Sequence, residues 1–259
     1  MEPGFRTPLL DFFRRGEVAP DVRMLAARGA LAPRAHEQLA LLVLLAGDSD
    51  PEISAAAEET LGRIPGESIA GFLARSDVGE DLVAFFGRRG ITPAETPVAD
   101  VDAPLVESET AEEAQEDNDE ADRLPLVQRL AQMSIVDKVR SAMKGTREER
   151  AILIRDANKV VAVAVLSSPK VTENEVEVFA RMANVSDEIL RIIGHTRAWV
   201  KNYGVALGLI RNPKTPLAIS MHLLPRLIER DLRMLSIDRN IPDPLRIAAR
   251  QKIVITDRR

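Results

Sequence analysis

A group of basic side chains around the chain's only tryptophan and tyrosine is the part of the sequence best suited to binding chemistry. Trp199 and Tyr203 lie four residues apart, a spacing that places both rings on one face of an α-helix. These residues indicate a basic, aromatic-bearing concave surface for an anionic partner, because Lys and Arg attract negative charge. The candidate partner-binding residues are Lys159, Lys170, Arg197, Trp199, Lys201, Asn202, Tyr203, Arg211 and Lys214.

A second interpretation of the same residues stays open. Large aromatic side chains usually pack in the protein interior, and Lys and Arg usually form a solvated face. Under this interpretation Trp199 and Tyr203 are core residues, and the cations around them bind nothing in particular.

No pattern in the sequence predicts catalysis or metal binding. There is no Gly-rich phosphate loop and no nucleophile elbow. The histidines His36, His195 and His222 are far apart in the sequence, so we expect ordinary histidines on helix surfaces. The chain has no cysteine, which excludes disulfides and cysteine-based zinc or iron–sulfur sites. We expect no catalytic residues, no metal site and no cofactor.

The composition favours an all-α protein. Hydrophobic residues make up 45% of the chain but aromatic residues only 3%, so the core is built from Leu, Ile, Val and Ala. Such a core suits helices packed on helices better than a β-sandwich or barrel. The longest apolar runs, Leu39–Ala46 and Val160–Leu166, fall short of the ~20 residues that a membrane span needs. The sequence therefore predicts a protein without a membrane span, in the reducing cytoplasm.

Charge divides the chain into three parts. Residues 92–122 contain 12 acidic and no basic side chains, whereas residues 123–259 contain 25 basic and 14 acidic side chains. A segment with dense like charge and few large apolar residues cannot offset its chain entropy, so we expect it to be disordered and protease-sensitive. The predicted organisation is an N-terminal helical-repeat domain (1–91), an acidic disordered linker (92–124) and a basic C-terminal helical-repeat domain (125–259).

Capping residues predict where several helices begin. Thr7 and Asp50 each precede a proline, as N-cap residues do at helix starts. The sequences that begin at Thr146 and Thr172 are capping boxes. We expect the helix that follows Thr146 to run to about Leu166. The sequence also predicts one uninterrupted helix over Arg197–Arg211.

The chain contains internal repetition. Asn184, Asn212 and Asn240 are 28 residues apart, always between apolar helical stretches. Asparagine tolerates the left-handed conformation, so each is expected to end a helix and let the chain turn. Apolar residues at matched offsets are expected to be buried between neighbouring helices: Phe179, Leu207 and Leu235 before the asparagine, and Ile189, Leu217 and Leu245 after it.

A longer repeat overlaps the first. The segment Asn158–Lys170 resembles the segment Asn202–Lys214, which lies 44 residues later. The helix pairs, their Asn-Pro or Asp-Pro turns and the fixed apolar offsets resemble HEAT-type and leucine-rich-repeat-variant α-solenoids. The resemblance covers roughly 156–250 and, more weakly, 25–86. It implies an irregular α-solenoid of stacked helix pairs, a fold that usually acts as a binding scaffold.

Three functional hypotheses follow. The first is a non-enzymatic scaffold or adaptor that binds another protein. The second is a nucleic-acid-binding protein, in which the basic C-terminal domain contacts phosphates and the acidic linker competes with them. The third is a HEAT-like enzyme that processes nucleic acid, which would need an Asp or Glu beside Trp199 in a cleft.

Overall fold

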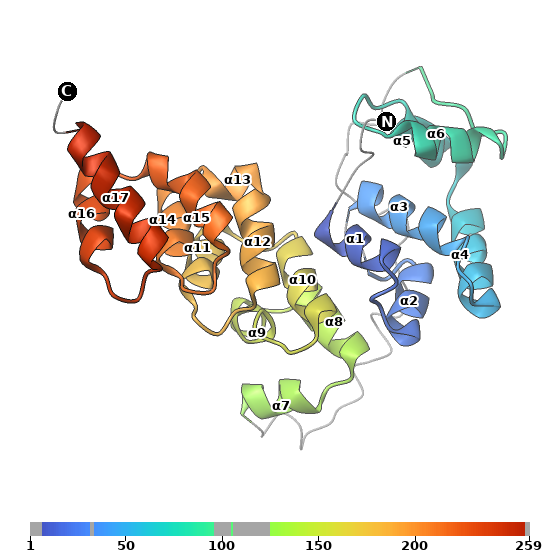
Figure 1. Cartoon of the computed structure of the whole chain (residues 1–259). Coiled ribbons are helices and arrows are strands. Elements are labelled where there is room, and N and C mark those ends of the chain that lie inside the picture. Colours follow the sequence, from blue (N-terminus) through green and yellow to red (C-terminus); the bar gives the residue numbers. More distant parts are fainter. Residues whose placement is uncertain (1–6, 32–33, 96–104, 106–124, 257–259) are drawn as a thin grey trace. The chain divides into compact units, whose positions relative to one another are not determined.

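The computed structural model describes residues 7–31, 34–95, 105 and 125–256 (Figure 1). Helices account for 69% of the described residues, which contain no strand. This confirms the predicted all-α class. Within the described part of the chain, every helix is too short or too polar to cross a lipid bilayer.

Contacts between Cα atoms divide the chain into two compact units. Unit 1 comprises residues 1–149 and 158–169, and unit 2 comprises residues 150–157 and 170–259. The helix α9 (Arg147–Leu153) begins in unit 1 and ends in unit 2. Neither unit is continuous in the sequence.

Unit 1 is a group of short helices around an aliphatic and phenylalanine core. Thr7 and Asp50 cap α1 and α4 as predicted, accepting hydrogen bonds from the backbone N–H groups of Leu10 and Glu52. Leu39 and Phe12 are almost fully buried. The helices are α1 (Pro8–Arg14), α2 (Pro20–Ala27), α3 (Ala35–Leu45), α4 (Pro51–Arg63), α5 (Gly66–Leu73), α6 (Glu80–Gly87), α7 (Leu126–Gln132), α8 (Ile135–Lys144) and α10 (Lys159–Ser167).

Unit 2 consists of helices joined by short turns. The helix α11 packs on α14, and α16 packs on α17. Its helices are α11 (Glu173–Arg181), α12 (Asp187–His195), α13 (Arg197–Val200), α14 (Tyr203–Arg211), α15 (Leu217–Leu223), the 3₁₀ turn η3 (Leu224–Arg226), α16 (Glu229–Ile237) and α17 (Asp243–Thr256).

The units are divided at a different place from the predicted domains. The helices α7, α8 and α10 were predicted in the C-terminal domain, but they fall in unit 1, where α8 packs on α2 and α10 packs on α1. Most of the acidic segment lies outside the described residues. Two of its described residues form hydrogen bonds within unit 1: the N–H of Ala94 donates to the carbonyl of Ala70 (2.9 Å), and the N–H of Leu105 donates to Oε1 of Gln38 (2.8 Å).

Two helices that the sequence predicted as continuous are broken. The chain leaves α9 after Leu153 and starts α10 at Lys159, where Asn158 accepts a hydrogen bond from the N–H of Val160 (2.9 Å). It leaves α13 after Val200 and starts α14 at Tyr203. An asparagine N-cap therefore interrupts each apolar stretch, since its side chain satisfies N–H groups that have no partner within the helix.

The 44-residue repeat corresponds to two helix pairs in matching positions, α10 with α11 and α14 with α15. The helices α10 and α14 have equal length, each follows an asparagine N-cap, and α11 and α15 begin 44 residues apart. Ser168 and Asn212 occupy matching positions just after these helices. The Ser168 hydroxyl donates to the carbonyl of Met143 (2.7 Å), and the Asn212 amide donates to the carbonyls of Ala180 (2.9 Å) and Met182 (3.0 Å). Each side chain thus satisfies backbone carbonyls near the end of a neighbouring helix.

The 28-residue asparagine spacing does not mark one structural position. Similar turns follow α10, α11, α14 and α16, and each turn begins at the C-cap residue of its helix: Ser168, Met182, Asn212 and Asp238. Asn212 is itself a C-cap, whereas Asn184 and Asn240 each lie two residues after one. No described residue other than glycine has a positive φ, so the prediction that these asparagines adopt the left-handed conformation is wrong. Measured from the start of the turn, the position three residues before it and the position seven after it are buried in every case: Val165, Phe179, Leu209 and Leu235, then Glu175, Ile189, Ile219 and Leu245.

Around Asn212, the buried positions differ from those that the asparagine spacing predicted. The prediction holds for Leu245 but is wrong for Leu217, which is 40% exposed, and Leu207 is only half-buried. Leu209 and Ile219 take their places in the interior.

Candidate functional site

The structure does not gather the nine predicted partner-binding residues into one site. Lys159 belongs to unit 1, and the other eight belong to unit 2. Trp199 and Tyr203 lie on different helices, so the prediction that they share one helix face is wrong. The other predicted residues lie in turns or near helix ends, and they are described below in three groups.

Tyr203 and Arg211 surround a buried carboxylate. The Tyr203 hydroxyl donates to Oδ2 of Asp231 (2.5 Å) and accepts from the N–H of Ile228 (3.3 Å), and Nη2 of Arg211 lies 3.5 Å from Oδ1 of Asp231. Asp231 is only 3% exposed. Burial and then the Asp231 carboxylate raise the pKa of Tyr203. These contacts tie α14 to α16, which is a structural role.

Asn202 also has a structural role. Its side-chain oxygen accepts from the N–H groups of Gly204 (2.8 Å) and Val205 (3.4 Å), which caps α14, and its amide lies 3.4 Å from Oε2 of Glu173. Lys170 and Lys214 are exposed in the turns before α11 and α15. Like Tyr203, Asn202 is a predicted binding residue whose interactions are internal.

Arg197 and Lys201 line a pocket of about 360 Å³ in unit 2. They come from α13 and the turn after it. His195, at the end of α12, and His222, on α15, line the same pocket, as does Arg226 in η3. The other lining residues are Gly194, Val200 and Leu223. Five basic side chains and no acidic one therefore surround this cavity, which we call the cationic pocket.

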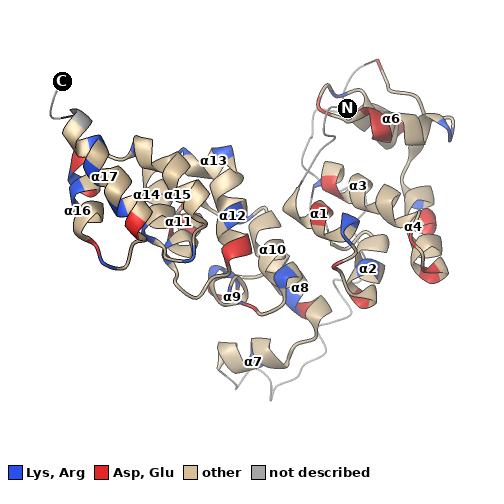
Figure 2. Ribbon diagram, viewed as in Figure 1, with Lys and Arg blue, Asp and Glu red and all other residues tan. Residues whose placement is uncertain are grey.

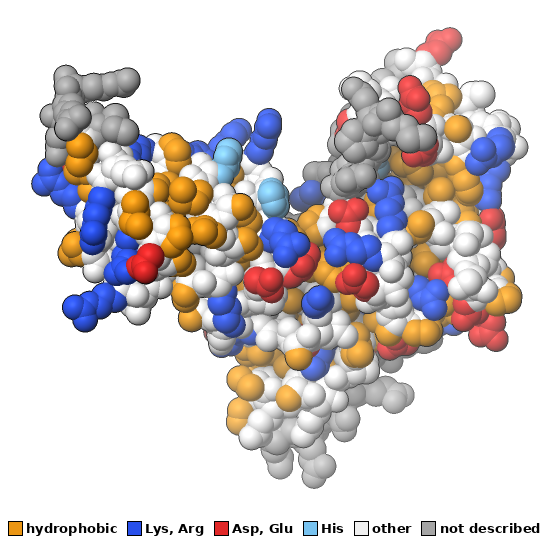
Figure 3. Space-filling model, viewed as in Figure 1, with side chains coloured by type: hydrophobic (Ala, Val, Ile, Leu, Met, Phe, Trp, Pro, Cys, Tyr) orange, Lys and Arg blue, Asp and Glu red, His pale blue; other side chains and the backbone are white. Residues whose placement is uncertain are grey.

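The local sequence explains the charge of the cationic pocket. Residues 189–228 contain six Lys or Arg and no Asp or Glu. Among the residues that the structure describes, Arg197, Lys201 and Arg226 have no ion-pair partner, and all three are exposed. Figure 2 shows Lys and Arg on α13, whereas α4 and α6 of unit 1 carry Asp and Glu. Figure 3 shows histidine side chains beside Lys and Arg over α12 and α13.

A close helix approach brings the two histidines to one pocket. Gly194 precedes His195, and a Cβ at Gly194 would lie 2.6 Å from Cγ2 of Ile219. Real Cβ atoms essentially never come this close to another atom, so the approach of α12 to α15 depends on glycine. Ile219 and His222 share one face of α15 because they are three residues apart. The packing at Gly194 therefore positions both imidazoles.

The histidines show what the sequence reasoning missed. His36 is buried at 5% exposure, so the expectation of a surface histidine is wrong there. Its ring packs edge-on against Phe72, and burial lowers its pKa. His195 and His222 are on the surface as expected, but their shared pocket was not predicted, and neither was Arg226. The available signal was the absence of carboxylates over residues 189–228.

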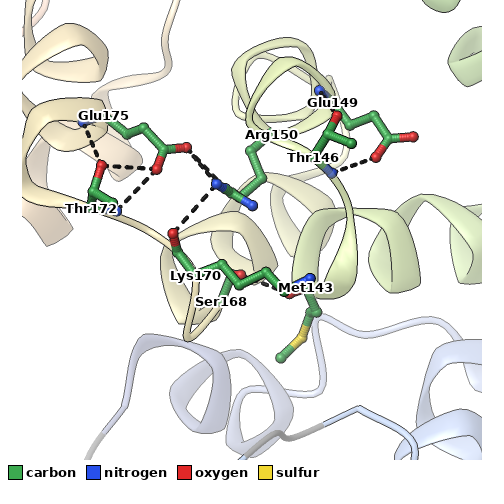
Figure 4. Close-up of polar contacts among 8 residues, drawn as sticks. All are labelled: Met143, Thr146, Glu149, Arg150, Ser168, Lys170, Thr172 and Glu175. Atoms are coloured by element: carbon green, nitrogen blue, oxygen red, sulfur yellow. Dashed lines mark hydrogen bonds and ion pairs between the residues drawn. The ribbon is translucent and has the colours of Figure 1, made fainter.

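Another arginine of unit 2 is fully paired. Arg150, on α9, is buried against Glu175 of α11, with Nη2 2.8 Å from Oε1, and it also donates to the carbonyl of Lys170 (3.4 Å) (Figure 4). Glu175 closes the predicted capping box by accepting from the N–H of Thr172 (3.0 Å). Burial favours the neutral acid, but the hydrogen bonds from Thr172 and Arg150 outweigh it and lower the pKa of Glu175.

The predicted capping box at Thr146 is also present. The N–H of Thr146 donates to Oε2 of Glu149 (2.7 Å), and the N–H of Glu149 donates to the Thr146 hydroxyl (3.3 Å) (Figure 4).

The chain matches no protein-family model, no curated protein and no solved structure. Among the described residues, no three His, Cys, Asp or Glu side chains are arranged to hold a metal ion.

Proposed function

We propose that this protein is a non-enzymatic scaffold that binds another protein through the exposed face of α15, α16 and α17. The observation that carries the proposal is the exposure of large apolar side chains on these three helices. Ile237 is 70% exposed and Ile247 is 52% exposed. Leu217, Met221 and Met234 are also exposed.

The apolar side chains of this face follow helical spacing. Leu217 and Met221 are four residues apart on α15, and Ile247 and Val254 are seven apart on α17, so each pair lies on one side of its helix. Figure 3 shows hydrophobic side chains gathered over α14, α15 and α17. Large apolar side chains exposed on neighbouring helices are typical of a protein-interaction site. We call it the apolar face.

The recurring turns support an architecture that suits such a scaffold. Helices stacked through repeated, similarly capped turns are the building principle of α-solenoids, which bind partners along an extended surface. We propose an irregular α-solenoid in which the acidic segment joins the helices before it, α1–α6, to the helices after it, α7–α17. The lack of cysteine is compatible with the reducing cytoplasm as its location.

The experiment is affinity capture with the full chain from a nuclease-treated lysate of the source cells. The test variants are Leu217→Glu and Met221→Glu, and the matched control is Val127→Glu, because Val127 is an exposed apolar residue of α7 in unit 1. We expect the same captured proteins with the wild type and the control, and their loss with both test variants. Capture that is indifferent to Leu217 and Met221 would contradict the proposal.

A second function, nucleic-acid binding, is favoured by one observation, the stretch 189–228 that contains basic residues and no carboxylates. Phosphate contacts make binding steeply salt-dependent. If this is the function, capture succeeds only from a lysate that has not been treated with nuclease, and there Arg226→Gln and Lys214→Gln weaken it while Leu217→Glu does not.

A further inference from the structure

We propose that the cationic pocket is a binding site for a phosphate monoester. The proposal rests on the pocket alone and does not depend on the apolar face. It concerns five side chains, which come from the end of α12, from α13 and the turn after it, from α15 and from η3: His195, Arg197, Lys201, His222 and Arg226.

The donors of the cationic pocket match the acceptors of a phosphate monoester. Such an ester has three terminal oxygens and a charge close to −2 near neutral pH. Two guanidinium groups, one ammonium group and two imidazoles offer many N–H donors, and arginine pairs with phosphate through two parallel hydrogen bonds. No carboxylate lines the cavity to compete for these donors.

The cations of the cationic pocket are not neutralised by neighbouring carboxylates. Arg197, Lys201 and Arg226 face one cavity, and their ion-pair partners are not found in the described part of the chain. Like charges gathered around one cavity repel each other, and a bound dianion converts the repulsion into attraction. By contrast, Arg211 and Arg150 of the same unit each contact a buried carboxylate.

The size and lining of the cavity favour a monoester over a nucleic-acid backbone. A volume of about 360 Å³ lies at the lower end of the range for small-ligand sites. Leu223 is 1% exposed and Val200 is 8% exposed, so the lining also includes buried apolar side chains. A phosphodiester carries one negative charge per phosphate and must continue in both directions, whereas this pocket offers one compact cluster of cations.

The chain carries its own reporter for the test. Trp199 is the only tryptophan, and it lies on α13 between Arg197 and Lys201. We would titrate the full chain at constant ionic strength with inorganic phosphate, with a phosphoserine peptide and with its unphosphorylated form, following tryptophan fluorescence and heat by calorimetry. A short DNA duplex is the fourth probe.

The variants are Arg197→Gln and Arg226→Gln, with Arg226→Lys as the charge-conserving variant. The control is Lys214→Gln, because Lys214 is exposed in the same acid-free stretch but does not line the pocket. All three positions are on the surface, and circular dichroism checks that the helices remain.

We expect saturable binding of inorganic phosphate or of the phosphopeptide. Each glutamine variant should weaken it on the order of tenfold, Arg226→Lys by less, and Lys214→Gln by less than about twofold. A tighter phosphopeptide identifies a phosphorylated side chain as the source of the ester, and tighter inorganic phosphate identifies a small metabolite. No saturable binding, equal weakening by Lys214→Gln, or DNA binding that is tighter than phosphate binding and indifferent to the variants would overturn the proposal.

Discussion

Arginine has opposite surroundings in two regions of unit 2. Arg150 is 4% exposed, and its guanidinium contacts Glu175 and the carbonyl of Lys170. In the cationic pocket, Arg197 and Arg226 are exposed and line a cavity without a carboxylate. The first region satisfies its charge internally, and the second leaves its charge available to a ligand.

The partner, and not the residue type, separates a structural cation from a cation that is available to a ligand. A buried charge without a partner is severely destabilising, so Arg150 depends on Glu175. An exposed charge is solvated by water and needs no partner to be tolerated. The arginine charge therefore serves stability in the first region and, under the phosphate proposal, serves recognition in the second.

The largest expected effect comes from breaking the buried pair. Replacing Arg150 with Met leaves the Glu175 carboxylate buried without its main charged partner, and we expect the free energy of unfolding to fall by about 3–5 kcal/mol. Chemical denaturation of the full chain, followed by circular dichroism, measures it. A loss below about 1 kcal/mol would mean that the pair is not an essential part of unit 2.

Acid provides the control for this variant. The pKa of Glu175 is lowered in the folded protein, so its ionisation stabilises the fold above the unfolded pKa. That stability is lost as the pH falls through the lowered, folded pKa. The wild type should therefore lose stability on acidification, and Arg150→Met should lose less, because part of the interaction is already absent.

A second test extends the comparison to apolar residues. Leu209 is fully buried, whereas Leu217 is 40% exposed although the 28-residue pattern predicts burial. We expect Leu209→Ala to cost about 2–5 kcal/mol and Leu217→Ala less than about 0.5 kcal/mol in unfolding free energy. Similar losses of unfolding free energy for both variants would support burial at positions counted from the asparagines. They would contradict burial at positions counted from the C-caps Ser168, Met182, Asn212 and Asp238.

The smallest expected effect is the stability change of Arg226→Gln. Because Arg226 is exposed, its loss should change the unfolding free energy by less than about 0.5 kcal/mol. Thermal and chemical denaturation at two salt concentrations measure this change. If the variant loses more than about 1 kcal/mol, Arg226 has a structural role, and the contrast with Arg150 disappears.

Local signals in the sequence predicted the structure well. The capping boxes at Thr146 and Thr172 and the caps at Thr7 and Asp50 depend on residues within one helical turn, so the sequence alone contains the interaction. The helix breaks at Asn158 and Asn202 were missed, because the apolar residues around each asparagine continue with helical spacing. In both cases the asparagine side chain caps a new helix instead.

Features that arise from the packing of distant helices could not be predicted from such local patterns. His195 and His222 line one pocket only because α12 and α15 approach closely at Gly194 and Ile219. Nothing in the spacing of the two histidines encodes that approach. Likewise, Tyr203 was predicted to bind a partner, but the carboxylate that its hydroxyl contacts lies 28 residues away, at Asp231.

The interleaving of the two units has a consequence for how this gene can change. Residues 150–157 belong to unit 2 and residues 158–169 to unit 1, so the chain passes between the units more than once. A single crossover with a related gene would always join pieces of different parentage within at least one unit. Arg150 and Glu175 would then have to be inherited together across α10. The two units are therefore expected to evolve as one linked block and not as modules that can be exchanged.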